Sequence, residues 1–227
     1  MKPASSSRRT PSRARSAWGR ADAQGRHELV LHAAMDLLRT GGVAALTMRA
    51  VADRLGIAVM TLYTYTDGLD ELRRRLVERG FAIMRSGCEQ HADPPGPHRW
   101  REGARRYLRF ASENPSLYEL MFGVPVNAPQ DLRVLEHGIQ PLMDAVREQL
   151  LASGLSAGME EADLRRRVRV LAGRFWVALH GLASLTVSGR LGVLEGGQDG
   201  VLDDLLDAVS PARTALTELT PSSSASR

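Results

Sequence analysis

A chain of 227 residues is long enough for one or two domains with a sizeable hydrophobic core. Its hydrophobic content of 43%, its charged content of 25% and its single cysteine, Cys88, are typical of a soluble globular protein and exclude a fold held by internal disulfides. The net charge is +4, yet residues 1–26 carry seven basic residues and one acidic residue, so the excess of positive charge belongs to the N-terminal segment.

The sequence also argues against two kinds of targeting segment. Residues 1–26 contain no apolar core segment of the kind that a secretory signal requires. The longest apolar stretch, residues 170–187, contains Arg174 and His180, and it predicts a buried helix better than a membrane span. We therefore expect a cytoplasmic protein with no membrane partner.

The N-terminal segment precedes the first predicted helix. Residues 1–22 are rich in Ser, Arg, Ala and Pro without an apolar period, so we expect a disordered basic arm. A helix is predicted from His27 to Arg39, and the glycines at 41 and 42 end it. Its apolar residues have the spacing of one buried helical face: Val30, Ala33, Ala34, Leu37 and Leu38.

Residues 47–65 predict two short helices joined by a turn at Gly56. Val51, Ala52 and Leu55 line one side of the first helix, and Leu62 points back from the second. Glycine suits this turn because it adopts positive φ without a Cβ clash. Two crossed helices with such a turn form a helix-turn-helix, whose second helix can enter the DNA major groove. The alternative is an ordinary helical hairpin in the core of a bundle.

These residues and their neighbours resemble the TetR family of bacterial transcription regulators. The resemblance lies in Ala33–Leu38, Gly41–Val43, Leu46–Arg49, Val51–Ala52, Leu55–Ile57 and Thr61–Tyr63. Two further patches, Glu113–Phe122 and Trp176–Gly181, resemble a subfamily with a Trp-x-x-x-His-Gly signature in its C-terminal domain. The resemblance implies a homodimer that binds a double-stranded DNA operator.

The predicted recognition helix, residues 58–65, has no Arg, Lys, Asn or Gln, the side chains that pair bidentately with guanine or adenine. Base reading would then rest on threonine hydroxyls, on apolar contacts with thymine methyl groups and on DNA shape. Thr47 is a predicted N-cap that could instead bond a phosphate, and Tyr65 could be a core residue instead of a phosphate contact. The predicted DNA-binding set is Thr47, Arg49, Arg54, Ala58, Val59, Met60, Thr61, Tyr63, Thr64 and Tyr65.

The sequence departs from the family pattern directly after the recognition helix. Family members usually have an aromatic residue at the position of Thr66 and a phosphate-binding lysine at the position of Leu69. The arginines at 73–75 could compensate for the missing cation, but such a run is more often a solvated face. The resemblance therefore implies either weaker intrinsic DNA affinity or heavier reliance on the N-terminal arm, which would contact phosphates or the minor groove. The alternative for the arm is a solubilising tail.

A second, all-helical domain follows a break at residues 91–97, which include three prolines. A fourth helix, residues 69–90, precedes the break. We therefore predict four parts: a disordered arm (1–22), a DNA-binding domain with connecting helix (23–90), a helical effector-binding and dimerisation domain (98–219) and a disordered tail (220–227). Helices are expected over residues 99–112, after Pro115, over 130–152 with a kink at Pro141, over 160–191 and over 201–209.

The second domain is rich in side chains that suit a pocket for an apolar small molecule. The candidates are Met84, Cys88, Trp100, Tyr107, Tyr118, Phe122, Met143, Trp176 and His180, many of which must also be core. The six histidines include no His-x-x-x-His pair and no cysteine partner, so we expect no metal site and no cofactor. We find no catalytic constellation either and expect no enzyme activity.

Together these features predict an all-α protein with an N-terminal three-helix DNA-binding unit, containing the helix-turn-helix, joined to a C-terminal helical ligand-binding and dimerisation domain. By resemblance it would be a transcriptional regulator, a repressor released from its operator by a small apolar effector. The alternative is a helical ligand- or partner-binding protein with weak or lost DNA binding, which the departure at Leu69 motivates. A small helical enzyme is a further, disfavoured alternative.

Overall fold

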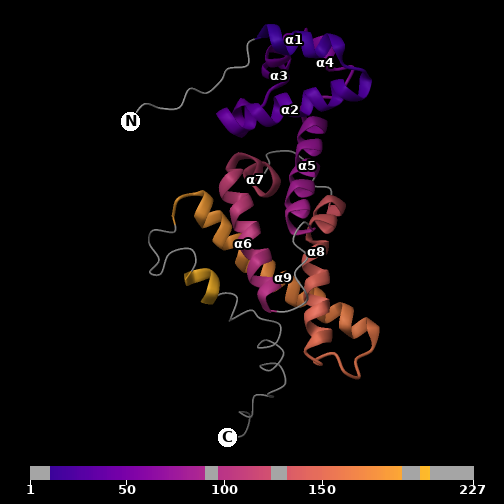
Figure 1. Cartoon of the computed structure of the whole chain (residues 1–227), viewed down its shortest axis with the longest axis vertical. Coiled ribbons are helices and arrows are strands. Elements are labelled where there is room, and N and C mark those ends of the chain that lie inside the picture. The colour runs from indigo at the N-terminus through magenta and orange to yellow at the C-terminus, as the bar shows by residue number, and fades with distance from the viewer. Residues whose placement is uncertain (1–10, 90–96, 124–131, 191–199, 205–227) are drawn as a thin grey trace, which may run out of the picture. The chain divides into compact units, whose positions relative to one another are not determined.

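The computed structural model describes residues 11–89, 97–123, 132–190 and 200–204. Within these residues every regular element is a helix and none is a strand, which confirms the all-α prediction (Figure 1). A short helical stretch at residues 200–204 follows the named elements. The named elements are α1 (Pro11–Arg20), α2 (Ala23–Gly41), the 3₁₀ turn η1 (Val43–Ala45), α3 (Met48–Leu55), α4 (Val59–Leu62), α5 (Leu69–Glu89), α6 (Pro97–Glu113), α7 (Pro115–Phe122), α8 (Leu132–Ala152) and α9 (Glu161–Val187).

The chain divides into two compact units. The first consists of Met1–Gly80 and Asn114–Pro129, and the second of Phe81–Glu113 and Gln130–Arg227. Helix α5 therefore begins in the first unit and ends in the second. Helix α7 belongs to the first unit because it packs against α2 and η1, whereas the sequence places it in the second domain.

The core of the first unit is built on α3. Helices α1, α2 and α4 each pack against it, and the three apolar side chains that the sequence assigned to its inner face, Val51, Ala52 and Leu55, are buried. Helix α2 ends where predicted, because the N–H of Gly42, at φ 72°, bonds the Leu38 carbonyl. Figure 1 shows α1, α3 and α4 gathered beside α2.

The prediction that residues 1–22 form a disordered arm is wrong for residues 11–20, which form helix α1. The physical reason is an apolar period hidden among the arginines. Ala14, Ala17, Trp18 and Ala21 follow the i, i+3, i+4, i+7 spacing of a helix face, and Trp18 is buried at 8% exposure. Residues 1–10 lie outside the described residues.

The second unit is a layer of three longer helices. Helix α9 packs against both α6 and α8, and eight of its residues are buried, among them Phe175 and Leu182. Helix α8 includes Pro141 in its interior, and the kink expected there stays a prediction. The ring of Phe81 lies where a Cβ on Gly138 would be, so α8 approaches the end of α5 closely.

Two helix ends predicted for this unit either differ from the observed ends or lie partly outside the described residues. Helix α9 ends at Val187 and not at residue 191, because Gly189, at φ 68°, turns the chain and the N–H of Arg190 bonds the Leu185 carbonyl at 2.9 Å. The predicted last helix is observed over residues 200–204, and its remainder to residue 209 is outside the described residues. The predicted proline break, apart from Pro97, and the predicted tail also lie outside them.

Candidate nucleic-acid interface

The two helices of the helix-turn-helix are joined by a turn that the local sequence specifies. Gly56 has the left-handed conformation φ 69°, ψ 33°, which only glycine adopts without strain. Its N–H bonds the Asp53 carbonyl at 3.2 Å, and the N–H of Ile57 bonds the Ala52 carbonyl at 3.1 Å. This is the Schellman arrangement, so α3 ends and α4 begins at a fixed angle.

Thr47 is the N-cap of α3, as predicted. Its hydroxyl oxygen accepts the backbone N–H of Ala50 at 3.1 Å. Because this bond uses an oxygen lone pair, the hydroxyl hydrogen is still able to donate to a phosphate. The two roles that the sequence left as alternatives are therefore chemically compatible.

The segment predicted to read DNA, residues 58–65, is helical only at Val59–Leu62 and continues as turns to Tyr65. We call residues 58–65 the recognition segment. Leu62 is fully buried and anchors the segment on the core. Ala58 and Thr64 are exposed, as are Met60 at 77% and Tyr63 at 49%, while Val59, Thr61 and Tyr65 are half-buried. The exposed face thus carries apolar groups and hydroxyls, as the sequence indicates.

The two arginines predicted to contact phosphates differ in their surroundings. Arg49 is exposed at the start of α3. Arg54 is half-buried, and its Nη1 lies 3.8 Å from the Asp36 carboxylate of α2. A phosphate contact by Arg54 would compete with this long ion pair, whereas Arg49 forms no ion pair with another residue in the part of the chain that the structure describes.

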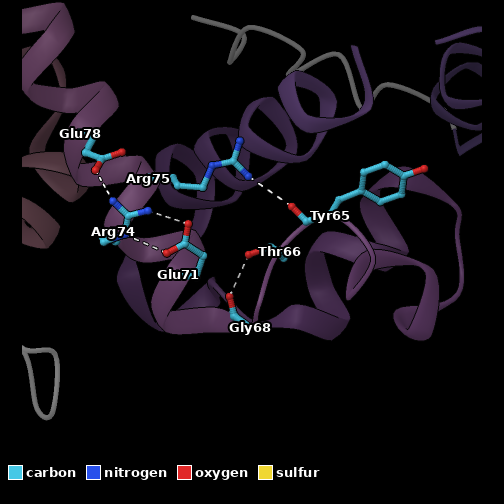
Figure 2. Close-up of polar contacts among 7 residues, drawn as sticks. All are labelled: Tyr65, Thr66, Gly68, Glu71, Arg74, Arg75 and Glu78. Carbon is cyan, nitrogen blue, oxygen red and sulfur yellow. Dashed lines mark hydrogen bonds and ion pairs between the residues drawn. The ribbon is translucent and has the colours of Figure 1, made fainter. Parts of the chain in front are cut away.

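Of the two departures from the pattern that the sequence resembles, Thr66 is drawn in Figure 2. Thr66 is buried at 5% exposure, and its hydroxyl donates to the Gly68 carbonyl at 3.2 Å. A satisfied hydroxyl is therefore accommodated where the family usually has an aromatic ring. Leu69, which replaces the family lysine, is half-buried at the start of α5.

The arginines at 73–75 are engaged within the chain. Arg73 pairs with Asp70 at 3.1 Å, and Arg74 lies between the carboxylates of Glu71 and Glu78 (Figure 2). The hydrogen bond from Arg74 holds the pKa of Glu71 below its ordinary value. Arg75 donates to the main-chain carbonyl of Tyr65 at 3.3 Å. These contacts argue against the run as a replacement for the missing lysine; of the predicted solvated face, Arg74 is exposed, whereas Arg73 and Arg75 are half-buried.

Tyr65, at the end of the recognition segment, is contacted from three helices. Trp18 of α1 meets its ring edge-to-face at a centroid distance of 5.0 Å, and His27 of α2 does so at 5.3 Å. Arg26 of α2 donates to its hydroxyl at 2.9 Å. Figure 2 shows that the Tyr65 ring points away from its own carbonyl, which Arg75 of α5 contacts.

Three residues of this unit were absent from the predicted set: Arg15, Trp18 and Arg26. The Nε–H of Arg15 donates to the Gly56 carbonyl at 2.9 Å, directly before the recognition segment. The apolar period around Trp18 is the sequence signal that marks α1 as a packed helix. The contacts of Arg15 and Arg26 join residues about forty positions apart, and helical periodicity carries no information on such pairs.

The predicted ligand-binding set is divided between the two units. Tyr118 and Phe122, both on α7 of the first unit, contact each other with tilted rings whose centroids are 4.8 Å apart. Tyr107, Trp176 and His180 come together in the second unit, where Met84 and Met143 are half-buried. The side chains of Cys88 and Trp100 lie outside the described residues.

The cluster of Tyr107, Trp176 and His180 joins α6 to α9. The His180 ring stacks on the Trp176 ring at 5.5 Å, and its Nδ1 lies 3.4 Å from the Tyr107 hydroxyl. Burial lowers the pKa of His180, so the imidazole is held neutral and its Nδ1 is able to accept a hydrogen bond from Tyr107. The three rings thus form an aromatic cluster in which the Tyr107 hydroxyl and His180 Nδ1 are partners of each other.

The outer face of α9 carries an exposed stripe of apolar and small residues, interrupted by Arg174 and formed by Val170, Val177, Gly181, Ser184, Leu185 and Ser188. Val177 is 65% exposed, Val170 45% and Leu185 39%. By length and hydropathy α9 is the one described helix that is able to cross a membrane. The same test is passed by core helices of soluble proteins, and the opposite face of α9 is packed on α6 and α8.

Comparisons with known proteins agree with this geometry. Residues 30–81 match the family model described as bacterial regulatory proteins of the tetR family, and residues 100–209 match the tetracyclin repressor-like C-terminal domain. The HTH-type transcriptional regulator Rv1816 of Mycobacterium tuberculosis is 26% identical over 189 residues, which cover 72% of this chain and 81% of that protein.

Among the solved structures that share the fold are two from Rhodococcus sp. RHA1. A TetR-like transcriptional regulator from Rhodococcus sp. RHA1 superposes with a TM-score of 0.55 at 21% identity, covering 86% of this chain and 99% of that chain. A protein of unknown function from the same organism superposes with a TM-score of 0.64 at 23% identity, covering 85% and 95%. At these identities the structural likeness establishes the fold alone.

Proposed function

We propose that this chain, which belongs to the TetR family of bacterial regulatory proteins and is a DNA-binding transcriptional regulator, acts as a homodimeric repressor that a small apolar effector releases from its operator. The observation that carries the proposal is the recognition segment. Its inner side is fixed by the buried Leu62, while Ala58, Met60, Tyr63 and Thr64 face solvent together.

The exposed recognition residues support a particular way of reading DNA. Threonine hydroxyls and the Tyr63 hydroxyl suit phosphate or base-edge hydrogen bonds, and Ala58 and Met60 suit thymine methyl groups. Because no side chain of the segment is able to pair bidentately with a base, sequence-dependent DNA shape would supply an unusual share of the specificity. Arg49 and the hydroxyl of Thr47 would bind the flanking phosphates.

The exposed stripe on α9 supports a homodimer. Val177 and Leu185 are large apolar side chains left in solvent, and Gly181 and Ser184 beside them allow a second helix to approach closely. A two-fold dimer would place two recognition segments about 34–36 Å apart, in successive major grooves of a near-palindromic operator.

The aromatic cluster of the second unit supports an effector site there. An apolar molecule against Tyr107 and Trp176 would gain apolar contact without disturbing the hydrogen bond between Tyr107 and His180. To lower operator affinity a hundredfold, the effector must bind the two states of the dimer with free energies that differ by about 2.7 kcal/mol. The predicted ligand residues of the same unit, Met84, Cys88, Trp100 and Met143, form part of this proposal, whereas Tyr118 and Phe122 of the first unit do not.

The subfamily and the cellular location of the protein are also part of the proposal. Trp176, His180 and Gly181 carry the Trp-x-x-x-His-Gly signature, and we assign the chain to that subfamily. We place the protein in the cytoplasm, where its operator is, and we give it no cofactor, no membrane partner and no catalytic step.

A reporter assay on a selected operator tests the repressor role. The operator is first obtained by letting the full-length protein enrich duplexes from a random-sequence library. A reporter gene placed behind that duplex should be silenced by the wild type and not by Tyr63→Ala, which removes an exposed recognition side chain. Activation of the reporter by the wild type would refute repression. If the wild type silences the reporter, small apolar molecules are then screened for one that restores its expression.

A further inference from the structure

We infer that helix α1 is a positioning element of the DNA-reading unit, in which Arg15 and Trp18 hold the two ends of the recognition segment. The inference rests on the proposed function, because it presumes that this segment reads an operator. Helix α1 precedes both regions that match the family models, which begin at residues 30 and 100. Neither family match therefore includes the contacts of α1.

The first end is held at the turn. The guanidinium of Arg15 uses its Nε–H to bond the carbonyl of Gly56 at 2.9 Å, two residues before the recognition segment begins. That carbonyl belongs to the glycine whose left-handed conformation sets the angle between α3 and α4. A charged donor on this carbonyl makes a stronger hydrogen bond than a neutral one would.

The second end is held at Tyr65. The buried Trp18 ring meets the Tyr65 ring at 5.0 Å and an interplanar angle of 85°, a favourable edge-to-face geometry. Arg26 ties the pair together, since it donates to the Tyr65 hydroxyl at 2.9 Å and to the Trp18 carbonyl at 3.3 Å. Its guanidinium carbon also lies 5.6 Å from the centre of the Trp18 ring.

The two contacts of α1 act as one unit because of their spacing. Arg15 and Trp18 are three residues apart, so they lie on the same face of the helix. Asp22, whose carboxylate accepts the N–H of Gly25 at 2.7 Å, caps α2 two residues after α1 ends, so the connection between the two helices is short. A shift of α1 would therefore move both ends of the recognition segment together.

The recognition segment needs such support. Helix α4 has only four residues, its N-cap Ala58 makes no side-chain cap bond, and the bonds from Leu62 and Tyr63 to the carbonyls of Ala58 and Val59 are long at 3.4 Å. So short a helix is unstable by itself, because nucleation costs more than one turn of hydrogen bonds returns. Small hydroxyls and methyl groups read bases only when they are placed accurately, so the placement of the segment sets the selectivity.

Matched arginine variants of the full-length protein test the inference. Arg15→Ala and Arg20→Ala each remove one positive charge from an exposed position of α1, but Arg20 takes no part in the contacts with Gly56 or Tyr65. Affinity is measured for a duplex that the wild type enriches from a random-sequence library and for an unselected duplex of equal length. The loss of one charge-assisted hydrogen bond predicts that Arg15→Ala lowers the ratio of the two affinities about tenfold. Arg20→Ala should weaken both affinities equally and leave the ratio unchanged.

A second pair of variants keeps the test independent of stability. Trp18→Ala should lower the same ratio, and Trp18→Phe, which keeps a ring against Tyr65, should restore most of it, with circular dichroism confirming that both are folded at the temperature of the assay. Ratios equal to the wild type in Arg15→Ala and Trp18→Ala would overturn the inference and leave the proposed function intact. A wild type that enriches no sequence at all would overturn the proposed function and the inference with it.

Discussion

At the scale of single residues, several polar side chains of the first unit have partners close to them in the sequence, and the recognition segment exposes only hydroxyls and apolar groups. Thr47 caps α3, Thr66 bonds the Gly68 carbonyl, and Arg74 is held by two carboxylates of its own helix. The exposed residues of the recognition segment supply hydroxyls and apolar groups only. Affinity and accuracy must therefore come from phosphate contacts and from placement.

Thr66→Val tests the first of these buried contacts. Valine has the same shape as threonine but lacks the hydroxyl that donates to Gly68, so we expect a loss of about 1 kcal/mol of unfolding free energy. Thr66→Ser keeps the hydroxyl and loses the methyl group instead, so it should retain the hydrogen bond to Gly68. Equal stability of Thr66→Val and the wild type in urea unfolding would show that the hydroxyl contributes nothing.

His180 predicts a pH dependence of stability. Burial lowers its pKa from 6.5 in the folded state, so the unfolded chain binds more protons below that pH. The stability contributed by the neutral imidazole is therefore complete above pH 6.5 and is lost as the pH falls through the lower, folded pKa. Thermal unfolding between pH 7.5 and pH 5.5 should show a smaller fall in Tm for His180→Gln than for the wild type. Parallel curves would contradict the assignment.

At the scale of elements, helix identities could be predicted from the sequence and several helix ends could not. Apolar spacing gave α2, α3, α6, α8 and α9, because each buries one face. Helix α1 was not predicted, because its three alanines and one tryptophan are weak apolar signals among many arginines. The end of α9 depends on Gly189 adopting positive φ, which a glycine permits without requiring.

In the candidate sites, too, helical periodicity predicts which residues are exposed or buried but not which helices come together. Exposure on the recognition segment follows from the helical period, so Met60 and Tyr63 could be predicted as outward. The ligand set could not be assembled in this way, because periodicity identifies a buried aromatic residue but not the helix that covers it. Tyr118 accordingly belongs to the first unit and Trp176 to the second.

Glycines in helices provide a test of packing at this scale. A Cβ at Gly138 would overlap the Phe81 ring, whereas a Cβ at Gly103 has no atom within 4 Å. We expect Gly138→Ala to lower the unfolding free energy by about 1–3 kcal/mol through overpacking. Gly103→Ala, its matched control, should raise that free energy by up to about 1 kcal/mol, because alanine favours a helix. If both substitutions stabilise the protein, the close approach of α8 to Phe81 is wrong.

At the scale of the whole molecule, the proposed mechanism requires two copies. The exposed stripe on α9 supports this, and Val177→Glu would place a charge at its most exposed large apolar side chain. We expect this variant to be monomeric in analytical ultracentrifugation and to lose most of its operator affinity, because one recognition segment then binds without its mate. Leu151→Glu makes the same change at a residue 51% exposed on α8 and should leave the dimer intact. A dimeric Val177→Glu variant would move the interface elsewhere.

The central claim is that this helix-turn-helix reads a specific duplex, and its most direct test is binding of the full-length protein to its selected operator across a salt series. We predict selective binding that weakens steeply with salt, with a slope of about −0.9 for each neutralised phosphate, and selectivity lost in Tyr63→Ala. Weak binding that is indifferent to sequence and to salt, and equal in the wild type and Tyr63→Ala, would contradict the claim and favour a helical ligand- or partner-binding protein.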